Sequence, residues 1–213
     1  MSFFENTRKP VGLGGKLMVV MMNLGHSPVA RWGLRFLELT LDAKVLDCGC
    51  GGGANIKRLL KKCPEGIVKG IDYSPVSVEK TKKINETAIA EGRCAVLRAS
   101  VAELPFKSEQ FDAVTAFETV YFWPDLPQCF REVYRVLKED GVLIAPTFTH
   151  AGNSFSGKVR AFFMKRVGFP LHSKWTSKEY LRFLRQNGWT VRKSAVLKAS
   201  FPLTYAECVK SEV

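Results

Sequence analysis

The chain lacks a long run of apolar residues. The apolar run at residues 17–22 follows Lys16 and is much shorter than the roughly 20 apolar residues that a transmembrane helix needs. No small-x-small cleavage site follows this run, so it is not typical of a secretory signal. Internal repeats and low-complexity tracts are also lacking. We therefore expect no membrane span and no repeat architecture.

Zinc-binding cysteine patterns are lacking as well. The six cysteines are scattered, and none belongs to a CxxC…CxxC or Cys/His arrangement. We therefore expect reduced thiols in a cytoplasmic protein without a metal site. For Cys48 and Cys50, which lie in a glycine-rich stretch, packing of small side chains beside a strand end is favoured over a functional thiol.

The composition is that of a globular enzyme. At 213 residues, with 46% hydrophobic and 24% charged residues, the chain is long enough for one domain with one core. Its formal net charge of +12 favours anionic partners such as nucleic acid, anionic lipid surfaces or acidic metabolites. However, much of this charge lies at residues 57–62 and 80–83, on the polar faces of predicted helices, where solvated lysines are normal.

Strand and helix patterns alternate from residue 44 onward, which predicts a mostly parallel sheet with helices on both faces. Strands are predicted at 45–48, 67–72, 94–98, 111–117 and 141–148, and helices at 54–63, 75–90 and 126–138. A capping box opens a later helix at 176–187, and residues 189–197 and 203–209 follow as an antiparallel pair of closing strands. Two further helices are expected before the sheet, at 16–24 and from Ser27 to about residue 39.

The stretch VLDCGCGGG at residues 45–53 is a predicted ligand-binding turn between a strand and a helix. Gly49, Gly51 and Gly53 alternate within it. Glycines allow positive φ and remove the Cβ atoms that would keep a ligand away, and the following helix directs its N–H groups at the site. Gly49, Gly51 and Ala54 satisfy the dinucleotide pattern GxGxxA, with Asp72 downstream to hold a ribose.

Five segments together resemble another family, the class I S-adenosylmethionine-dependent methyltransferases, and among them the small, type-11-like domains. The segments are VLDCGCGGG, GIDYSP, ASVAELPF, FDAVTAFETVYFWPD and LKEDGVLI, and they cover residues 44–144. The resemblance implies an α/β fold: a Rossmann-like, doubly wound, mostly parallel seven-stranded sheet with an antiparallel closing strand. It also implies S-adenosyl-L-methionine as cofactor and S-adenosyl-L-homocysteine as product.

The resemblance assigns roles to single residues. Asp47 would lie near the methionine end of the cofactor, Asp72 would accept both ribose hydroxyls, and Tyr73 would pack on the adenine. At the adenine amino group the family usually has an acid, but this chain has Ser100. The predicted cofactor-binding residues are Asp47, Cys48, Gly49, Cys50, Gly51, Gly53, Asn55, Asp72, Tyr73, Ser74, Ser100, Val101, Ala102 and Phe117.

Methyl transfer from a sulfonium is an in-line displacement, so positioning and desolvation are the main tasks of the enzyme. A general base is needed only if the acceptor carries a proton at working pH. Glu118 and Tyr121 are the candidate catalytic residues, followed by His26, His150 and His172. A structural or cofactor-contact role for Glu118 and a lining role for Tyr121 remain alternatives.

The resemblance divides one methyltransferase domain into four parts: N-terminal lid helices (1–43), a cofactor-binding core (44–148), a cap insertion (149–175), and a closing helix with strands (176–213). The lid and cap are expected to select the acceptor, because they lie outside the shared core. Their aromatic residues suggest an apolar or aromatic pocket with basic residues at its rim: Trp32, Phe155, Phe162, Phe163 and Trp175.

Three functions remain open from the sequence. The favoured one is a methyltransferase acting on a small molecule, anionic or aromatic in character. The second is an RNA or protein methyltransferase that uses the basic surface. The third is a non-catalytic cofactor-binding module or an NAD-dependent oxidoreductase built on the same turn.

Overall fold

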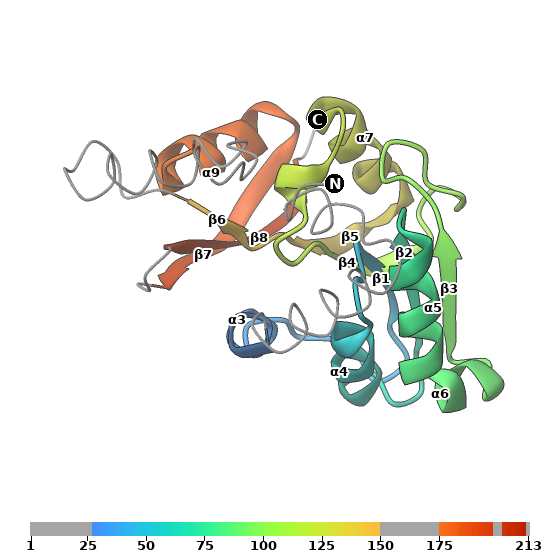
Figure 1. Cartoon of the computed structure of the whole chain (residues 1–213). Coiled ribbons are helices and arrows are strands. Elements are labelled where there is room, and N and C mark those ends of the chain that lie inside the picture. The colour runs from blue at the N-terminus through green and yellow to red at the C-terminus, as the bar shows by residue number, and fades with distance from the viewer. Residues whose placement is uncertain (1–26, 150–174, 198–201, 212–213) are drawn as a thin grey trace.

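A computed structural model describes residues 27–149, 175–197 and 202–211 of the chain (Figure 1). The helices are α3 (Ser27–Leu34), α4 (Ala54–Lys62), α5 (Pro75–Ile84), α6 (Glu86–Ala90), the 3₁₀ turn η1 (Val120–Phe122), α7 (Leu126–Val136) and α9 (Ser177–Gln186). The strands are β1 (Lys44–Cys48), β2 (Ile67–Asp72), β3 (Cys94–Arg98), β4 (Phe111–Thr115), β5 (Leu137–Ile144), β6 (Thr147–Phe148), β7 (Trp189–Leu197) and β8 (Leu203–Lys210).

The strands form one sheet with the order β3-β2-β1-β4-β5-β8-β6, and β7 pairs with β8. The pairs β1–β2, β1–β4, β2–β3 and β4–β5 are parallel, whereas β8 runs antiparallel to β5, β6 and β7. This confirms the predicted doubly wound, mostly parallel α/β sheet and the antiparallel closing pair. The chain order reverses between β1 and β4, where ligands bind in such sheets.

The described residues form an eight-stranded sheet, one strand more than the seven predicted, because one predicted strand is divided in two. The single strand predicted at 141–148 is divided: β5 ends at Ile144, and β6 begins at Thr147 after Ala145 and Pro146. Proline has no N–H to donate to a sheet, which accounts for a break at this point. The short β6 pairs with Leu203 and Thr204 of β8.

Three helix predictions also need correction. The helix predicted from Ser27 to about residue 39 ends at Leu34. The helix predicted at 75–90 is divided at Asn85 into α5 and α6, and the helix predicted at 126–138 ends at Val136 because Leu137 already pairs with Phe111 of β4. The predicted N-cap Ser74 and the capping box between Thr176 and Glu179 are confirmed. The predicted helix at 16–24 and most of the cap insertion lie outside the described residues.

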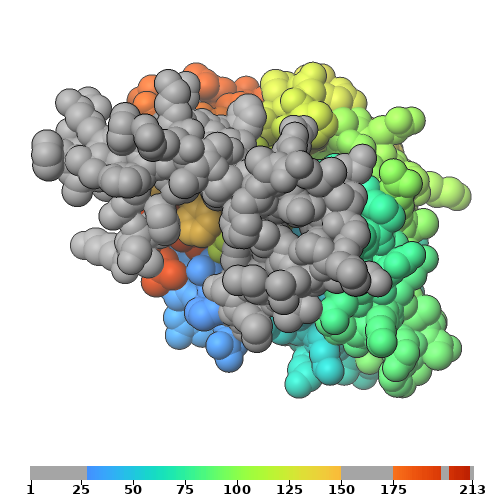
Figure 2. Space-filling view, viewed as in Figure 1, coloured from blue at the N-terminus to red at the C-terminus, as the bar shows by residue number. Residues whose placement is uncertain are grey.

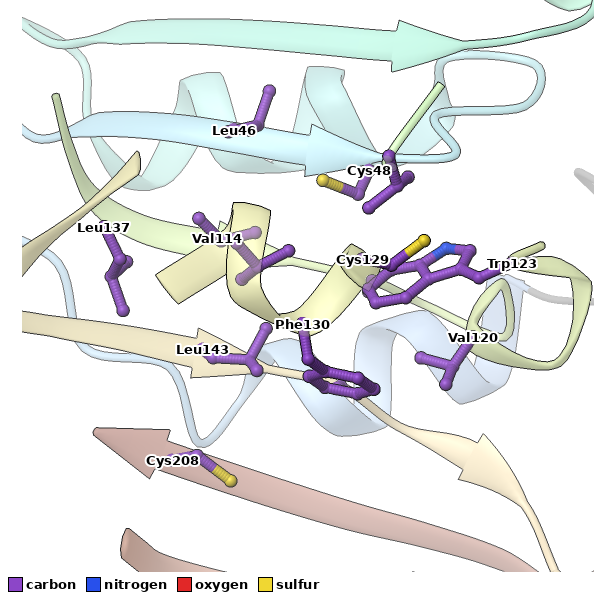
Figure 3. Close-up of a cluster of buried hydrophobic side chains, with 14 of the residues drawn as sticks. Leu46, Cys48, Val114, Val120, Trp123, Cys129, Phe130, Leu137, Leu143 and Cys208 are labelled. Atoms are coloured by element: carbon purple, nitrogen blue, oxygen red, sulfur yellow. The ribbon is translucent and has the colours of Figure 1, made fainter. Parts of the chain in front are cut away.

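Alternation along the strands creates two buried layers. In β1, Val45 faces a core cluster shared with α3, α4 and α5, whereas Leu46 and Cys48 face a second cluster shared with α7 and α9. Figure 1 shows α4 and α5 on one side of the sheet and α7 on the other, and Figure 3 shows the second cluster, with Trp123 beside Cys129 and Phe130. Helices on both faces leave the strand ends as the place for a site.

Close packing fixes α3 to the sheet. A Cβ at Gly33 would lie 2.7 Å from the ring of Phe117, so the glycine lets the helix approach the residues that follow β4. Among the described residues, no helix combines the length and apolar character that a bilayer span requires.

Candidate functional site

The glycine turn follows β1 and adopts backbone conformations that favour glycine. The φ angles of Gly49, Gly51 and Gly53 are 78°, 53° and 80°. A Cβ at Gly49 would lie 2.5 Å from Thr119, and one at Gly53 would lie within 3 Å of Asn85 and Thr81. A Cβ at Gly51 would meet no heavy atom of the described residues within 4 Å. Gly49 and Gly53 therefore serve packing, and Gly51 borders open space where a ligand can approach the backbone.

Asp72, at the end of β2, holds the same turn. Its Oδ2 accepts a hydrogen bond from the Gly51 N–H at 3.0 Å, and its Oδ1 accepts one from the Ser74 N–H at 2.9 Å. Burial raises the pKa of the Asp72 carboxyl from 3.8 to about 6, although these N–H donors act in the opposite direction. Each carboxylate oxygen has a second lone pair, so the group retains capacity for a ligand hydroxyl.

Asp47, at the end of β1, is more deeply buried. Its Oδ1 accepts a hydrogen bond from the Thr115 hydroxyl at 2.7 Å, while its buried Oδ2 has no hydrogen-bond partner among the described residues. Burial is the main cause that raises the pKa of Asp47 to about 6, with a smaller contribution from the charge of Asp72. A buried carboxylate oxygen without a donor is costly. It is suited to a donor group, such as an ammonium, supplied by a ligand.

A hollow of about 370 Å³ opens next to Asp72 along the sheet edge, lined by Tyr73, Arg98, Ala99 and Ser100. The Ser100 hydroxyl accepts a hydrogen bond from the Ala102 N–H at 3.2 Å, so these two predicted residues already contact each other. Arg98 donates from Nε to the Tyr73 carbonyl at 3.2 Å. Sequence reasoning missed Arg98, although its place opposite Asp72 in the predicted parallel sheet would have indicated it.

Three polar residues that the sequence analysis did not select hold the turn from outside. Thr81 donates to the Gly51 carbonyl at 2.8 Å, Asn85 donates to the Gly53 carbonyl at 3.2 Å, and Thr119 donates to the Cys48 carbonyl at 3.0 Å. The break between α5 and α6 occurs at Asn85, whose side chain faces the turn. These contacts join residues some 30 or 70 positions apart, so no local sequence pattern could have found them.

The two turn cysteines and Asn55 have different surroundings. Burial, followed by the charge of neighbouring acids, raises the pKa of both Cys48 and Cys50 thiols well above 9, which favours neutral packing groups over reactive thiolates. Asn55 lies on the first turn of α4, and its Oδ1 accepts a hydrogen bond from Arg58 Nη1 at 2.9 Å.

The residues after β4 bring Phe117, Glu118 and Tyr121 to the same edge. All three are buried, and Glu118 has a φ of 57°, which is rare for a residue other than glycine. Burial, and then the charge of Glu118, raise the pKa of the Tyr121 hydroxyl well above 10. This hydroxyl therefore stays protonated and is suited to donate a hydrogen bond.

Of the aromatic residues expected in an acceptor pocket, two pack against other aromatic side chains, and three lie outside the described residues. Trp32 packs edge-on against Phe36 and Tyr205, and Trp175 stacks on Tyr180 and Phe183 at 5.4 and 4.8 Å. Phe155, Phe162, Phe163 and the candidate bases His26, His150 and His172 lie outside the described residues. In the described ranges, no group of three or more potential metal ligands occurs.

Part of the sequence is similar to a known methyltransferase domain. Residues 46–145 match the family model described as "Methyltransferase domain". The chain is 35% identical to cycloartenol-C-24-methyltransferase 1 of Oryza sativa subsp. japonica over 107 residues, which are 48% of this chain and 31% of that protein. It is 27% identical to the 2-phytyl-1,4-naphtoquinone methyltransferase of Nostoc sp. over 140 residues, 65% of this chain and 61% of that protein. The chain thus spans less than two thirds of the length of either relative.

Solved structures show the same fold. A SAM dependent methyltransferase from Aquifex aeolicus has a TM-score of 0.64 and 19% identity, over 86% of this chain and 89% of that chain. A geranyl diphosphate methyltransferase in complex with GPP and sinefungin has a TM-score of 0.71 and 15% identity, over 86% of this chain and 77% of that chain. At these identities the likeness establishes the architecture.

Proposed function

We propose that the chain, which is similar to a methyltransferase domain over residues 46–145, is a class I S-adenosylmethionine-dependent methyltransferase and transfers a methyl group to a small-molecule acceptor. The observation that carries the proposal is the pair of acids at neighbouring strand ends, the buried Asp47 and the half-buried Asp72, of which Asp72 binds the Gly51 N–H. S-adenosyl-L-methionine supplies an electrophilic methyl group on a sulfonium. It also carries an ammonium and two ribose hydroxyls. Asp47 Oδ2 has no donor among the described residues, and the Asp72 oxygens, which already accept from Gly51 and Ser74, can each accept a further hydrogen bond.

The residues of the site fit this cofactor. Asp47 Oδ2, buried and without a described partner, would accept from the ammonium. The remaining lone pairs of Asp72 would accept from the ribose hydroxyls, and the hollow beside Tyr73 and Ser100 would take the adenine. The remaining predicted contacts, at Cys48, Cys50, Asn55, Ser74, Val101, Ala102 and Phe117, stay predictions.

Catalysis would depend on positioning at the end of β4. Glu118 and Tyr121 lie beside the turn that would hold the methyl donor, and both are buried, so water is largely kept from this region. A protonated Tyr121 hydroxyl would orient an acceptor by donating a hydrogen bond. We assign to Glu118 the role of general base for an acceptor that must lose a proton.

The acceptor class that we propose is a small molecule with an apolar body. The relatives named above act on cycloartenol and on a phytyl naphthoquinone, according to their names. At the same edge Tyr121 lies 4.5 Å from Phe122 and 6.3 Å from Phe148, measured between ring centroids. Atoms of the chain around β6 reach the surface between α3 and α9 (Figure 2). We assign acceptor selection to residues 1–43 and 149–175, which flank the matched core.

Neither alternative gains support. The comparisons reported above name methyltransferases of small molecules, and nothing in them favours a nucleic-acid or protein acceptor or an NAD-dependent oxidoreductase. Six cysteines that are buried and unpaired fit a reducing compartment, which is the support for a cytoplasmic location.

Calorimetric titration with S-adenosyl-L-homocysteine tests the donor half of the proposal. We expect saturable binding, and the absence of binding at millimolar ligand would refute it. The acceptor half is tested by transfer of a labelled methyl group from S-adenosyl-L-methionine to a panel of sterols, quinols and isoprenoid compounds. Methyl transfer to RNA or to a peptide in the same assay would show the RNA or protein methyltransferase instead. Tight binding of NADH in a titration would show the NAD-dependent oxidoreductase.

A further inference from the structure

Residues 99–110 connect β3 to β4 and form part of the wall of the hollow that we propose for the adenine. Ala99 and Ser100 line that hollow, and the Ala99 N–H donates to the Asp72 carbonyl at 3.2 Å. Apart from an isolated bridge between Ser100 and Glu103, this connection has no strand or helix of its own. A connection of this length without regular structure needs other contacts to define its shape.

One face of α7 supplies those contacts. The Leu104 N–H donates to Glu132 Oε2 at 2.7 Å, and Arg135 donates to the carbonyls of Leu104 at 3.1 Å and Phe106 at 2.8 Å. Gln128 Nε2 donates to the Ala102 carbonyl at 3.2 Å. The side chains of Gln128, Glu132 and Arg135, called the clamp below, thus bind every second residue of the connection from 102 to 106.

Two side chains of this clamp also bind each other. Glu132 and Arg135 form two hydrogen bonds of 2.8 Å, from Arg135 Nε and Nη2 to the two carboxylate oxygens. Arg135 lowers the pKa of the Glu132 carboxyl, and Glu132 raises the pKa of the Arg135 guanidinium, so both stay charged. A bidentate pair of this kind has a defined orientation that a lysine could not reproduce.

We propose that Gln128, Glu132 and Arg135 of α7 are positioning residues for the adenine side of the cofactor site. This inference rests on the proposed function. The three side chains do not line the hollow; they hold residues 102–106 and thereby the adjoining wall at Ala99 and Ser100. Without the clamp, the connection would sample more conformations, and the ligand would have to order it on binding.

Arg135→Ala is the principal test, read by calorimetric titration with S-adenosyl-L-homocysteine. Because the clamp includes several hydrogen bonds to charged groups, we expect the variant to weaken binding about tenfold. 5′-Methylthioadenosine, which lacks the amino-acid part, should lose affinity by the same factor, since the change is at the adenine side. Glu132→Gln should lose less than Arg135→Ala, because its amide oxygen still accepts from the Leu104 N–H.

Lys138→Ala is the matched control. It removes another partly exposed ion pair, with Asp112, that contacts no residue between 99 and 106. Both ligands should bind this variant as they bind the wild type. Thermal unfolding of all variants identifies any that do not fold. If Arg135→Ala is one of them, Gln128→Ala must weaken binding about threefold. This variant loses the bond to Ala102 and two bonds that Gln128 Oε1 accepts from Arg131, which does not contact the connection in the described residues.

The outcomes separate the two proposals. A wild-type protein that does not bind S-adenosyl-L-homocysteine overturns the proposed function, and this inference with it. A wild-type protein that binds, together with an Arg135→Ala variant of unchanged affinity, overturns this inference alone. A variant that loses S-adenosyl-L-homocysteine affinity but keeps that for 5′-methylthioadenosine also overturns it.

Discussion

Cofactor affinity should depend strongly on pH, because the two acids of the site must be ionised to bind it. The pKa values of Asp47 and Asp72 are both raised from 3.8 to about 6. An ammonium and a pair of ribose hydroxyls are donors, and a protonated carboxyl has lost part of its capacity to accept. The binding-competent protein is therefore the form in which both carboxyls are charged.

The magnitude follows from the ionised fractions. With a pKa of about 6, each carboxyl is about 90% ionised at pH 7 and about 10% ionised at pH 5. If both must be charged, the competent fraction falls about a hundredfold over this interval, and the apparent Kd rises by the same factor. The interval lies below the range in which the α-amino group of the ligand titrates.

Titration calorimetry with S-adenosyl-L-homocysteine between pH 5 and 7 is the assay. The Asp47→Asn variant is the control, because it retains the shape of the side chain and removes one titration. Its affinity should be lower at pH 7 but should change only about tenfold over the interval, since Asp72 alone remains. A wild-type Kd that stays constant from pH 5 to 7 would refute the reasoning.

The same shifts have the opposite effect on the stability of the ligand-free protein. A carboxyl with a raised pKa binds its proton more tightly in the folded than in the unfolded chain. Its contribution to the unfolding free energy is therefore greatest below about pH 4 and disappears as the pH rises to about 6. From a rise of the pKa from 3.8 to about 6, this contribution is at most about 3 kcal/mol for Asp47. Urea unfolding of wild type and Asp47→Asn over this range gives the difference.

Three substitutions separate packing from binding. Gly51→Ala should weaken S-adenosyl-L-homocysteine binding at least tenfold, because the new Cβ enters the ligand space. The melting temperature should fall only slightly, because the new side chain meets no described atom and the left-handed conformation alone costs about 1–2 kcal/mol. Gly49→Ala should instead unfold at a clearly lower temperature, because its Cβ would lie 2.5 Å from Thr119; an unchanged melting temperature would contradict this. Asp72→Ala should reduce cofactor binding by about 1–3 kcal/mol in calorimetry, and equal affinity would place the ribose elsewhere.

The sequence predicts the donor half of the site because its determinants are local. Asp47, the turn glycines and Asp72 are close in sequence and lie directly at strand ends, so their relative positions follow once the sheet is parallel. The raised pKa values of both acids come chiefly from burial, which depends on the folded chain around them and not on the local sequence.

The supporting contacts could not be predicted in the same way. Thr81 and Asn85 appear in the sequence as two polar positions of one amphipathic helix, and only the packing of α5 on the sheet brings them to the turn. The strand predicted at 141–148 is interrupted at Pro146. A proline is a reason to expect such a break, but the continuous apolar pattern around it favoured a single strand. Where the chain departs from regular structure, long-range packing decides the outcome.

The electrostatics of the site differ from those of the whole molecule. The chain carries a net charge of +12, yet burial raises the pKa of both acids at the glycine turn, and the charge of Asp72 raises that of Asp47 further. A cationic methyl donor is repelled by the overall charge, but surface charges are screened by salt within about 10 Å, whereas buried groups in contact with the ligand are not. We therefore expect Asp47 and Asp72, and not the net charge of the chain, to determine the affinity for the methyl donor.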